Sequence, residues 1–141
     1  MQSPGAAEEY ITPIGGVHLT KRPVLVVDDN AAFARSIVRL LESLGQPAIA
    51  ALSAYDAIDT LDESRNVGFV VADVRMPEID GFDFVRVVRH RFPRIPLALM
   101  TAYPTDNEDI PQGVPVLVKP FEIEQLMALL SSERPPSGHH A

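Results

Sequence analysis

The sequence predicts an α/β protein built on a doubly wound parallel sheet, and two observations lead to this prediction. Short apolar runs recur along the chain, and four of the five are followed by a segment with apolar residues at helical spacing. The runs are continuous rather than alternating, which is typical of strands covered on both faces. Five such units predict a five-stranded sheet with helices packed on it.

Each expected element has its own signal. The expected strands are the apolar runs at 24–27, 47–52, 69–72, 97–100 and 116–118. The expected helices are the segments with apolar residues three or four apart, at 33–44, 54–63, 82–92 and 123–130. Gly45 and Pro93 supply stop signals for the first and third helices, and Ser53 is placed to cap the second. Helices and strands therefore alternate over most of the chain.

The segment between the fourth and fifth strands breaks this alternation. It contains Pro104, Pro111 and Pro115 and shows no apolar periodicity. Because proline interrupts helical hydrogen bonding, we expect the helix between these strands to be short or absent.

The two ends of the chain differ from its middle. We expect residues 23–132 to form one folded domain. Residues 1–22 contain prolines and glycines without sustained periodicity, so they are predicted to be a flexible, mostly irregular N-terminal arm. Residues 133–141 are predicted to be a C-terminal tail.

Composition excludes several classes of function. The chain carries 12 basic and 19 acidic residues, a net charge of −7, which argues against nucleic acid as a partner. It has no cysteine, so disulfides, thiol catalysis and zinc–thiolate sites are excluded. We expect no membrane segment or secretory signal, and a cytoplasmic location. Five basic residues near the third helix favour a solvated face over a surface for an acidic partner: Arg86, Arg89, His90, Arg91 and Arg94.

Polar residues follow the strands of the predicted sheet. Asp28 and Asp29 end the first apolar run, Asp73 ends the third, Thr101 the fourth and Lys119 the fifth. The carboxyl ends of parallel strands share one edge, so these side chains are expected to meet. Three carboxylates, a hydroxyl and an ammonium suit a divalent cation and a phosphoryl group.

These residues resemble the receiver domain of two-component response regulators, and the sequence is similar to receivers attached to hybrid sensor kinases. The motifs that carry the resemblance are Asp28-Asp29, Asp73 with Met76-Pro77 and Asp80-Gly81, Thr101-Ala102, and Lys119-Pro120-Phe121. The resemblance implies a flavodoxin-like sheet with strand order 2-1-3-4-5. It also implies phosphorelay signalling with a histidine kinase or a histidine phosphotransfer protein as partner.

The resemblance assigns a role to each acidic residue. Asp73 would be the phosphoacceptor, attacking a phosphohistidine of the partner. Asp29, Asp73 and the backbone carbonyl of Arg75 would ligate Mg²⁺, with Asp28 acting largely through a bound water. The cation would neutralise the three carboxylates and orient the phosphoryl group.

The resemblance also assigns roles at the last two strands. Lys119 would contact the phosphoryl oxygens, and Thr101 would donate a hydrogen bond to them. The peptide bond before Pro120 is expected to be cis. Receivers usually carry an aromatic residue three positions before the lysine, and here that residue is Val116. Tyr103 is a candidate to supply the missing ring.

The predicted function is a phosphorylatable receiver without an output domain. It is expected to assist only its own phosphorylation and dephosphorylation, so it is not classed as an enzyme, and a homodimer is possible. Two alternatives stay open. A phosphatase of the haloacid dehalogenase type uses similar groups, but it needs an Asp two residues after its nucleophile, where Asp28 is followed by Asn30. A pseudo-receiver would bind partners without being phosphorylated.

Overall fold

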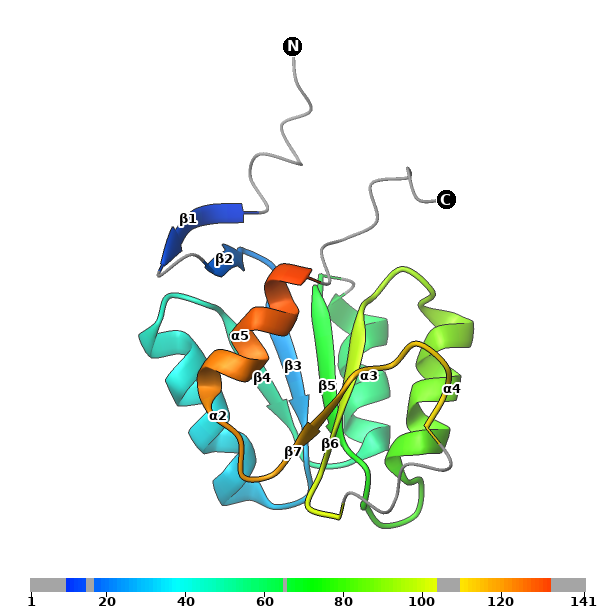
Figure 1. Ribbon diagram of the computed structural model, residues 1–141. Helices are drawn as coiled ribbons and strands as arrows, with labels where there is room; N and C mark the ends of the chain where they lie inside the picture. Colours follow the sequence, from blue (N-terminus) through cyan, green and yellow to red (C-terminus); the bar gives the residue numbers. More distant parts are fainter. Residues whose placement is uncertain (1–9, 15–16, 65, 104–109, 133–141) are drawn as a thin grey trace.

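A five-stranded parallel sheet forms the centre of the protein in a computed structural model (Figure 1). The structure describes residues 10–14, 17–64, 66–103 and 110–132. The strands of this sheet are β3 (Val24–Val27), β4 (Ala48–Ala51), β5 (Phe69–Asp73), β6 (Leu97–Thr101) and β7 (Val116–Val118). Their spatial order is β4-β3-β5-β6-β7, and all four pairings are parallel. The predicted order 2-1-3-4-5 is thus confirmed.

Burial explains why the strand runs are continuous. The three central strands, β3, β5 and β6, are buried at every position, whereas the edge strands β4 and β7 are partly exposed. A residue in a central strand faces one or the other helix layer, so both alternate positions must be apolar. The continuous apolar runs in the sequence therefore indicate that helices cover both faces of the central strands.

Within the described residues, four helices cover the two faces. They are α2 (Ala31–Ser43), α3 (Ala54–Ser64), α4 (Gly81–Arg91) and α5 (Ile123–Ser132). α2 contacts α5 on one face and α3 contacts α4 on the other, so the sheet divides the apolar core into two clusters (Figure 1). Right-handed crossovers between parallel strands produce this placement of helices on both faces. Across the described residues, no helix combines the length and the apolar character that a membrane crossing requires.

Local signals set the starts and ends of the helices. Asn30 caps α2, since its side chain accepts a hydrogen bond of 3.0 Å from the Phe33 amide. The Ser53 hydroxyl accepts one from the Asp56 amide at the start of α3, as predicted. Gly45 follows α2 with a positive φ of 90°, a conformation that glycine adopts without strain.

The connection between β6 and β7 has no helix in the parts that the structure describes, 102–103 and 110–115. Its remaining residues, 104–109, lie outside the described chain. Pro111 and Val114 form a turn with a backbone hydrogen bond of 3.2 Å. The Arg89 side chain on α4 donates to the Gln112 carbonyl, which ties this turn to the helix layer.

The N-terminal arm contains regular structure that the sequence analysis did not predict. Within residues 1–22, β1 (Tyr10–Ile14) and β2 (Val17–Thr20) pair as an antiparallel hairpin. β2 contacts α5, at the end of the protein where the sheet strands begin (Figure 1). A two-stranded hairpin is only marginally stable alone, so it depends on such tertiary contact, which no local pattern reveals. The predicted tail at 133–141 lies outside the described residues.

Candidate functional site

The carboxyl edge of the sheet gathers the five polar residues that the sequence places at strand ends. Backbone hydrogen bonds continue the ladder there: Asp28 N–H donates to Ala51, and Lys119 N–H donates to Thr101 at 2.7 Å. Asp73 is the last residue of β5, beside Met100 of β6. Hydrogen bonding within the sheet therefore holds the backbones of these strand-end residues side by side at the carboxyl edge, as the topology predicts.

Three carboxylates form a compact cluster at this edge. One oxygen from each of Asp28, Asp29 and Asp73 can be chosen so that all lie within 4.8 Å of one another. Asp28 is buried, with 1% of its surface exposed, Asp73 is 9% exposed, and Asp29 is exposed. The cluster thus combines two buried acids with one that faces solvent.

Lys119 supplies the positive charge. Its Nζ lies 2.7 Å from Asp28 Oδ2 and 3.3 Å from Asp73 Oδ1. The second oxygen of Asp28, Oδ1, accepts a hydrogen bond of 2.9 Å from the Asn30 amide. Both oxygens of this buried carboxylate therefore have partners, which offsets the cost of its burial.

The electrostatics of the cluster act most strongly on Asp73. Burial, followed by the repulsion from Asp28, raises the pKa of Asp73 from 3.8 to about 6, although attraction to Lys119 opposes the change. One ammonium does not balance three carboxylates. The site consequently has a local excess of negative charge that a divalent cation would neutralise.

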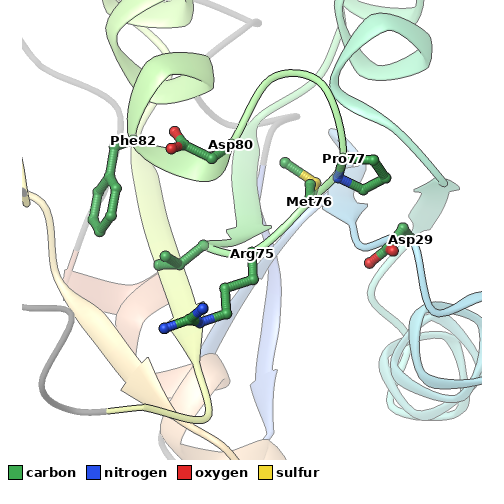
Figure 2. Close-up of a pocket in the computed structure, with 7 residues that line it drawn as sticks. Asp29, Arg75, Met76, Pro77, Asp80 and Phe82 are labelled. Carbon is green, nitrogen blue, oxygen red and sulfur yellow. The ribbon is translucent and has the colours of Figure 1, made fainter.

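The loop between β5 and α4 forms one wall of the site. A pocket of about 450 Å³ lies between Asp29 and this loop and is lined by Val74, Arg75, Met76, Pro77, Asp80 and Phe82 (Figure 2). Figure 2 shows Asp29 projecting toward the loop, while the Arg75 side chain extends away from Asp29. Asp80 does not join the carboxylate cluster, because it caps α4 by accepting from the Asp83 amide.

Gly81 has a structural role at the start of α4. Its φ is not among the positive values in the described chain, which belong to Gly45, Glu78 and Gly113. A Cβ at this position would instead collide with the carbonyl oxygen of Asp73. The absence of a side chain lets the start of α4 pack directly against the backbone of the proposed phosphoacceptor.

Thr101 and the residue two positions later are linked. The buried Thr101 hydroxyl accepts a hydrogen bond of 2.9 Å from the Tyr103 amide. Tyr103 is 53% exposed, and the Arg75 guanidinium carbon lies 4.4 Å from the centroid of its ring. The loops after β5 and β6 therefore meet through a cation–π contact at the rim of the site.

The position that is aromatic in most receivers is occupied by Val116. It pairs with Leu99 in the sheet and packs, partly buried, against the core cluster shared with α3 and α4. The exposed Tyr103 ring does not replace an inward-facing aromatic side chain in the structure. The predicted cis peptide bond between Lys119 and Pro120 is present.

One feature of the site was not predicted. Phe33 is the first residue of the expected helix at 33–44, and the centroid of its ring lies 4.2 Å from Lys119 Nζ. The signal available in the sequence was its position, four residues after Asp29 and thus in the first turn of α2.

The comparisons with known proteins define the class of this chain. The response regulator receiver domain family matches residues 24–131. The chain therefore belongs to this family, whose members act in two-component signalling with histidine kinases or phosphotransfer proteins. Receivers in general bind Mg²⁺ at an acidic pocket, and the three-carboxylate cluster provides such a pocket.

Particular relatives support the same class. The response regulator protein FleR of Pseudomonas aeruginosa is 35% identical over 112 residues, which make up 77% of this chain and 24% of FleR. A response regulator receiver protein from Pseudomonas putida has 28% identity and a TM-score of 0.72, with 81% of this chain and 99% of that one covered. The receiver domain of the hybrid histidine kinase CckA has 25% identity and a TM-score of 0.66, with 79% and 97% covered.

Proposed function

We propose that this protein accepts a phosphoryl group from a partner phosphohistidine onto Asp73. The observation that carries the proposal is the convergence of Asp28, Asp29 and Asp73 within 4.8 Å, with Lys119 Nζ 3.3 Å from Asp73. Thr101 ends the neighbouring strand at the same edge. This combination supplies a nucleophile, a cation and a hydrogen-bond donor for one phosphoryl group.

In the proposed reaction, a carboxylate oxygen of Asp73 attacks phosphorus in line with the bond to the leaving nitrogen. A P–O bond forms, the P–N bond breaks, and the imidazole nitrogen leaves with the electron pair. Because its pKa is about 6, Asp73 is largely ionised, and therefore nucleophilic, at neutral pH. The partner contributes the high-energy bond, so the receiver's residues act by positioning and by charge.

The residues fit Mg²⁺ as the ion of this site. Asp29 and Asp73 would hold it with the backbone carbonyl of Arg75, and Asp28 would contribute through water, since hard oxygen donors match this cation. When bound, Mg²⁺ supplies positive charge to the transferring oxygens and a fixed orientation for them. Asp29 is exposed and lines the pocket opposite Arg75, which leaves a route for the ion to enter.

Lys119 and Thr101 would take over the new charge. Lys119 already lies between Asp28 and Asp73, so it has to move little to contact phosphoryl oxygens on Asp73. For Thr101 to donate to the phosphoryl group, its hydroxyl must give up the hydrogen bond that it donates to the Tyr103 carbonyl oxygen at 3.2 Å. Phosphorylation would thereby reach the loop after β6 without an aromatic residue at position 116.

Two alternatives are less well supported. A haloacid dehalogenase-type phosphatase lacks its second acid here, since residue 30 is an Asn that caps α2. A pseudo-receiver without phosphorylation has no need for the complete set of acidic, hydroxyl and ammonium groups at one edge. We propose that the protein is a signalling receiver and does not turn over a separate substrate. The cytoplasmic location stays a prediction, and a homodimer stays a possibility.

The direct test is intact-mass measurement after incubation with acetyl phosphate and Mg²⁺. The wild-type chain should gain one phosphate that is stable in mild acid and labile in base. Asp73→Asn should gain none, and Asp80→Asn is the matched control, because Asp80 caps α4 outside the cluster. Phosphate retained by Asp73→Asn, or no uptake by the wild-type chain, would refute the proposal.

A further inference from the structure

We propose that Phe33 is a positioning residue for phosphoryl transfer, because its ring face holds the Lys119 ammonium beside the carboxylates. The inference rests on the proposed function, since Lys119 is the cation that would contact the phosphoryl group. It adds a residue of α2 to a site otherwise built from strand ends and loops.

The first step is the surroundings of the ammonium. Lys119 Nζ lies 2.7 Å from Asp28 Oδ2, 3.3 Å from Asp73 Oδ1 and 4.2 Å from the centroid of the Phe33 ring. An ammonium within about 6 Å of a ring centroid is attracted to the negative face of the aromatic ring. Two carboxylates and one ring face thus attract the same group.

The second step is how the ring is held. Phe33 lies in the first turn of α2, and Phe121 lies between the cis peptide bond and α5. Their centroids are 6.2 Å apart and their planes meet at 82°, an edge-to-face arrangement. Both residues are partly buried against the core cluster between α2 and α5. The Phe33 ring is therefore held by packing against the core and Phe121, in addition to its contact with Lys119.

The third step is what the ring does for Lys119. The Lys119 side chain is only 18% exposed, so its ammonium has given up much of its water. A flexible four-carbon side chain can place that charge in many positions, and a leucine at position 33 would fill space without attracting it. In the structure the ammonium contacts the ring face and lies 3.3 Å from Asp73 Oδ1 at the same time, so attraction to the ring is compatible with its place beside Asp73. This attraction favours the lysine conformations that are ready for transfer.

The contact itself can be tested in the metal-free, unphosphorylated protein. The chain contains two lysines, Lys21 and Lys119, so ¹³C-labelled lysine gives two sets of side-chain signals in NMR. The Lys119 methylene protons next to Nζ should be shifted upfield by the ring, with Lys21 as the internal reference. The shift should be lost in Phe33→Leu and kept in Phe33→Tyr. An unshifted Lys119 signal in the wild-type protein would overturn the inference.

The effect on transfer is tested with the rate of phosphorylation by acetyl phosphate at saturating Mg²⁺. We expect Phe33→Leu to lower this rate by between about twofold and thirtyfold, the range that follows from cation–π strengths. Phe33→Tyr should keep most of the wild-type rate. Phe92→Leu is the matched control, because it removes a ring that contacts Arg91 far from the site.

Two further measurements separate positioning from general damage. Phe121→Leu removes the edge-to-face partner but leaves the ring face, so its loss of rate should be smaller than that of Phe33→Leu. Mg²⁺ affinity should stay within about twofold of wild type in Phe33→Leu, since the contact that this substitution removes is with the Lys119 ammonium and not with a ligand of the proposed metal site. If Phe33→Leu matches Phe92→Leu in rate, the inference falls while the proposed function stands. If the wild-type chain takes up no phosphate, the proposed function falls and the transfer role with it.

Discussion

Two ion pairs at opposite ends of the sheet show how differently the same kind of contact can act. At the carboxyl edge, Lys119 bonds Asp28 with 18% and 1% of the two side chains exposed. At the other end, Arg91 of α4 bonds Asp62 of α3 with 43% and 44% exposed. Both pairs join elements distant in sequence, but only the first has lost most of its water.

The difference lies in the cost of separating the charges. Exposed pairs contribute between about 0 and 1 kcal/mol, because water solvates each partner nearly as well. A buried carboxylate that loses its cation keeps its desolvation cost without compensation. At the carboxyl edge a second buried acid, Asp73, increases that cost. The contribution of the Lys119–Asp28 pair to stability is thus sensitive to changes in local charge, whereas that of the Arg91–Asp62 pair is not.

The largest expected effect on stability comes from comparing two variants, each of which removes the cation of one ion pair. Lys119→Met should lower the free energy of unfolding of the metal-free protein at neutral pH by about 3 kcal/mol, because Asp28 stays buried without its partner. Arg91→Met should lower it by less than about 1 kcal/mol. Urea denaturation of both variants measures the difference. Equal losses would show that burial does not distinguish the two pairs.

The pH dependence of stability sharpens the comparison. The pKa of Asp73 is raised from 3.8 to about 6, so between these values the folded state binds the proton more tightly than the unfolded chain. This carboxyl therefore destabilises the metal-free fold as the pH rises through that range, and the full cost is present above it. Asp73→Asn removes the cost.

Asp73→Asn should accordingly stabilise the metal-free fold at pH 7 by at most about 3 kcal/mol, at about 1.4 kcal/mol per pKa unit. The gain should disappear near pH 4, where the wild-type carboxyl is protonated in the folded protein. Denaturation at several pH values tests this, with Asp62→Asn at the other end of the sheet as the control. A gain independent of pH would show that the ionisation of Asp73 is not its cause.

Magnesium should affect only the carboxyl edge. Mg²⁺ at 100 times its Kd should stabilise the wild-type fold by about 2.7 kcal/mol, and thermal melts with and without the ion should show the shift. Asp29→Ala should lose most of it, and its metal-free fold should be as stable as wild type or slightly more so. Asp62→Ala should keep the full shift. The same Mg²⁺ shift in Asp29→Ala and wild type would place the ion elsewhere.

The smallest effect on stability, and the most informative about switching, is expected from Thr101→Ala. With beryllofluoride and Mg²⁺ as the phosphoryl mimic, amide hydrogen exchange should change chiefly in residues 74–80 and in the loop that starts at Ala102. Thr101→Ala should leave phosphorylation measurable but remove much of the response in the second loop, since the hydroxyl that bonds the Tyr103 amide is gone. A response confined to α5 would mean that this loop is not the switch.

Much of the fold could be predicted because its signals are local. Continuous apolar runs, helical spacing, and capping residues such as Ser53 depend on neighbours a few residues away, so they are readable in the sequence. The order of the polar residues at strand ends followed from the same runs. The hairpin of β1 and β2 was not predicted, because its strands are short and have weak patterns. It contacts α5, which is distant in sequence.

The sequence by itself determined which residues end the strands, and therefore which acids, hydroxyl and lysine belong to the site. Only the tertiary structure decided how they act on one another. Lys119 reaches Asp28 across 91 positions, Gly81 packs on the Asp73 carbonyl, and the Phe33 ring faces the ammonium. The burial of Asp73 and its raised pKa also depend on the tertiary structure. The physical reason is that desolvation and charge interaction depend on distance in space, which a pattern of neighbouring residues does not contain.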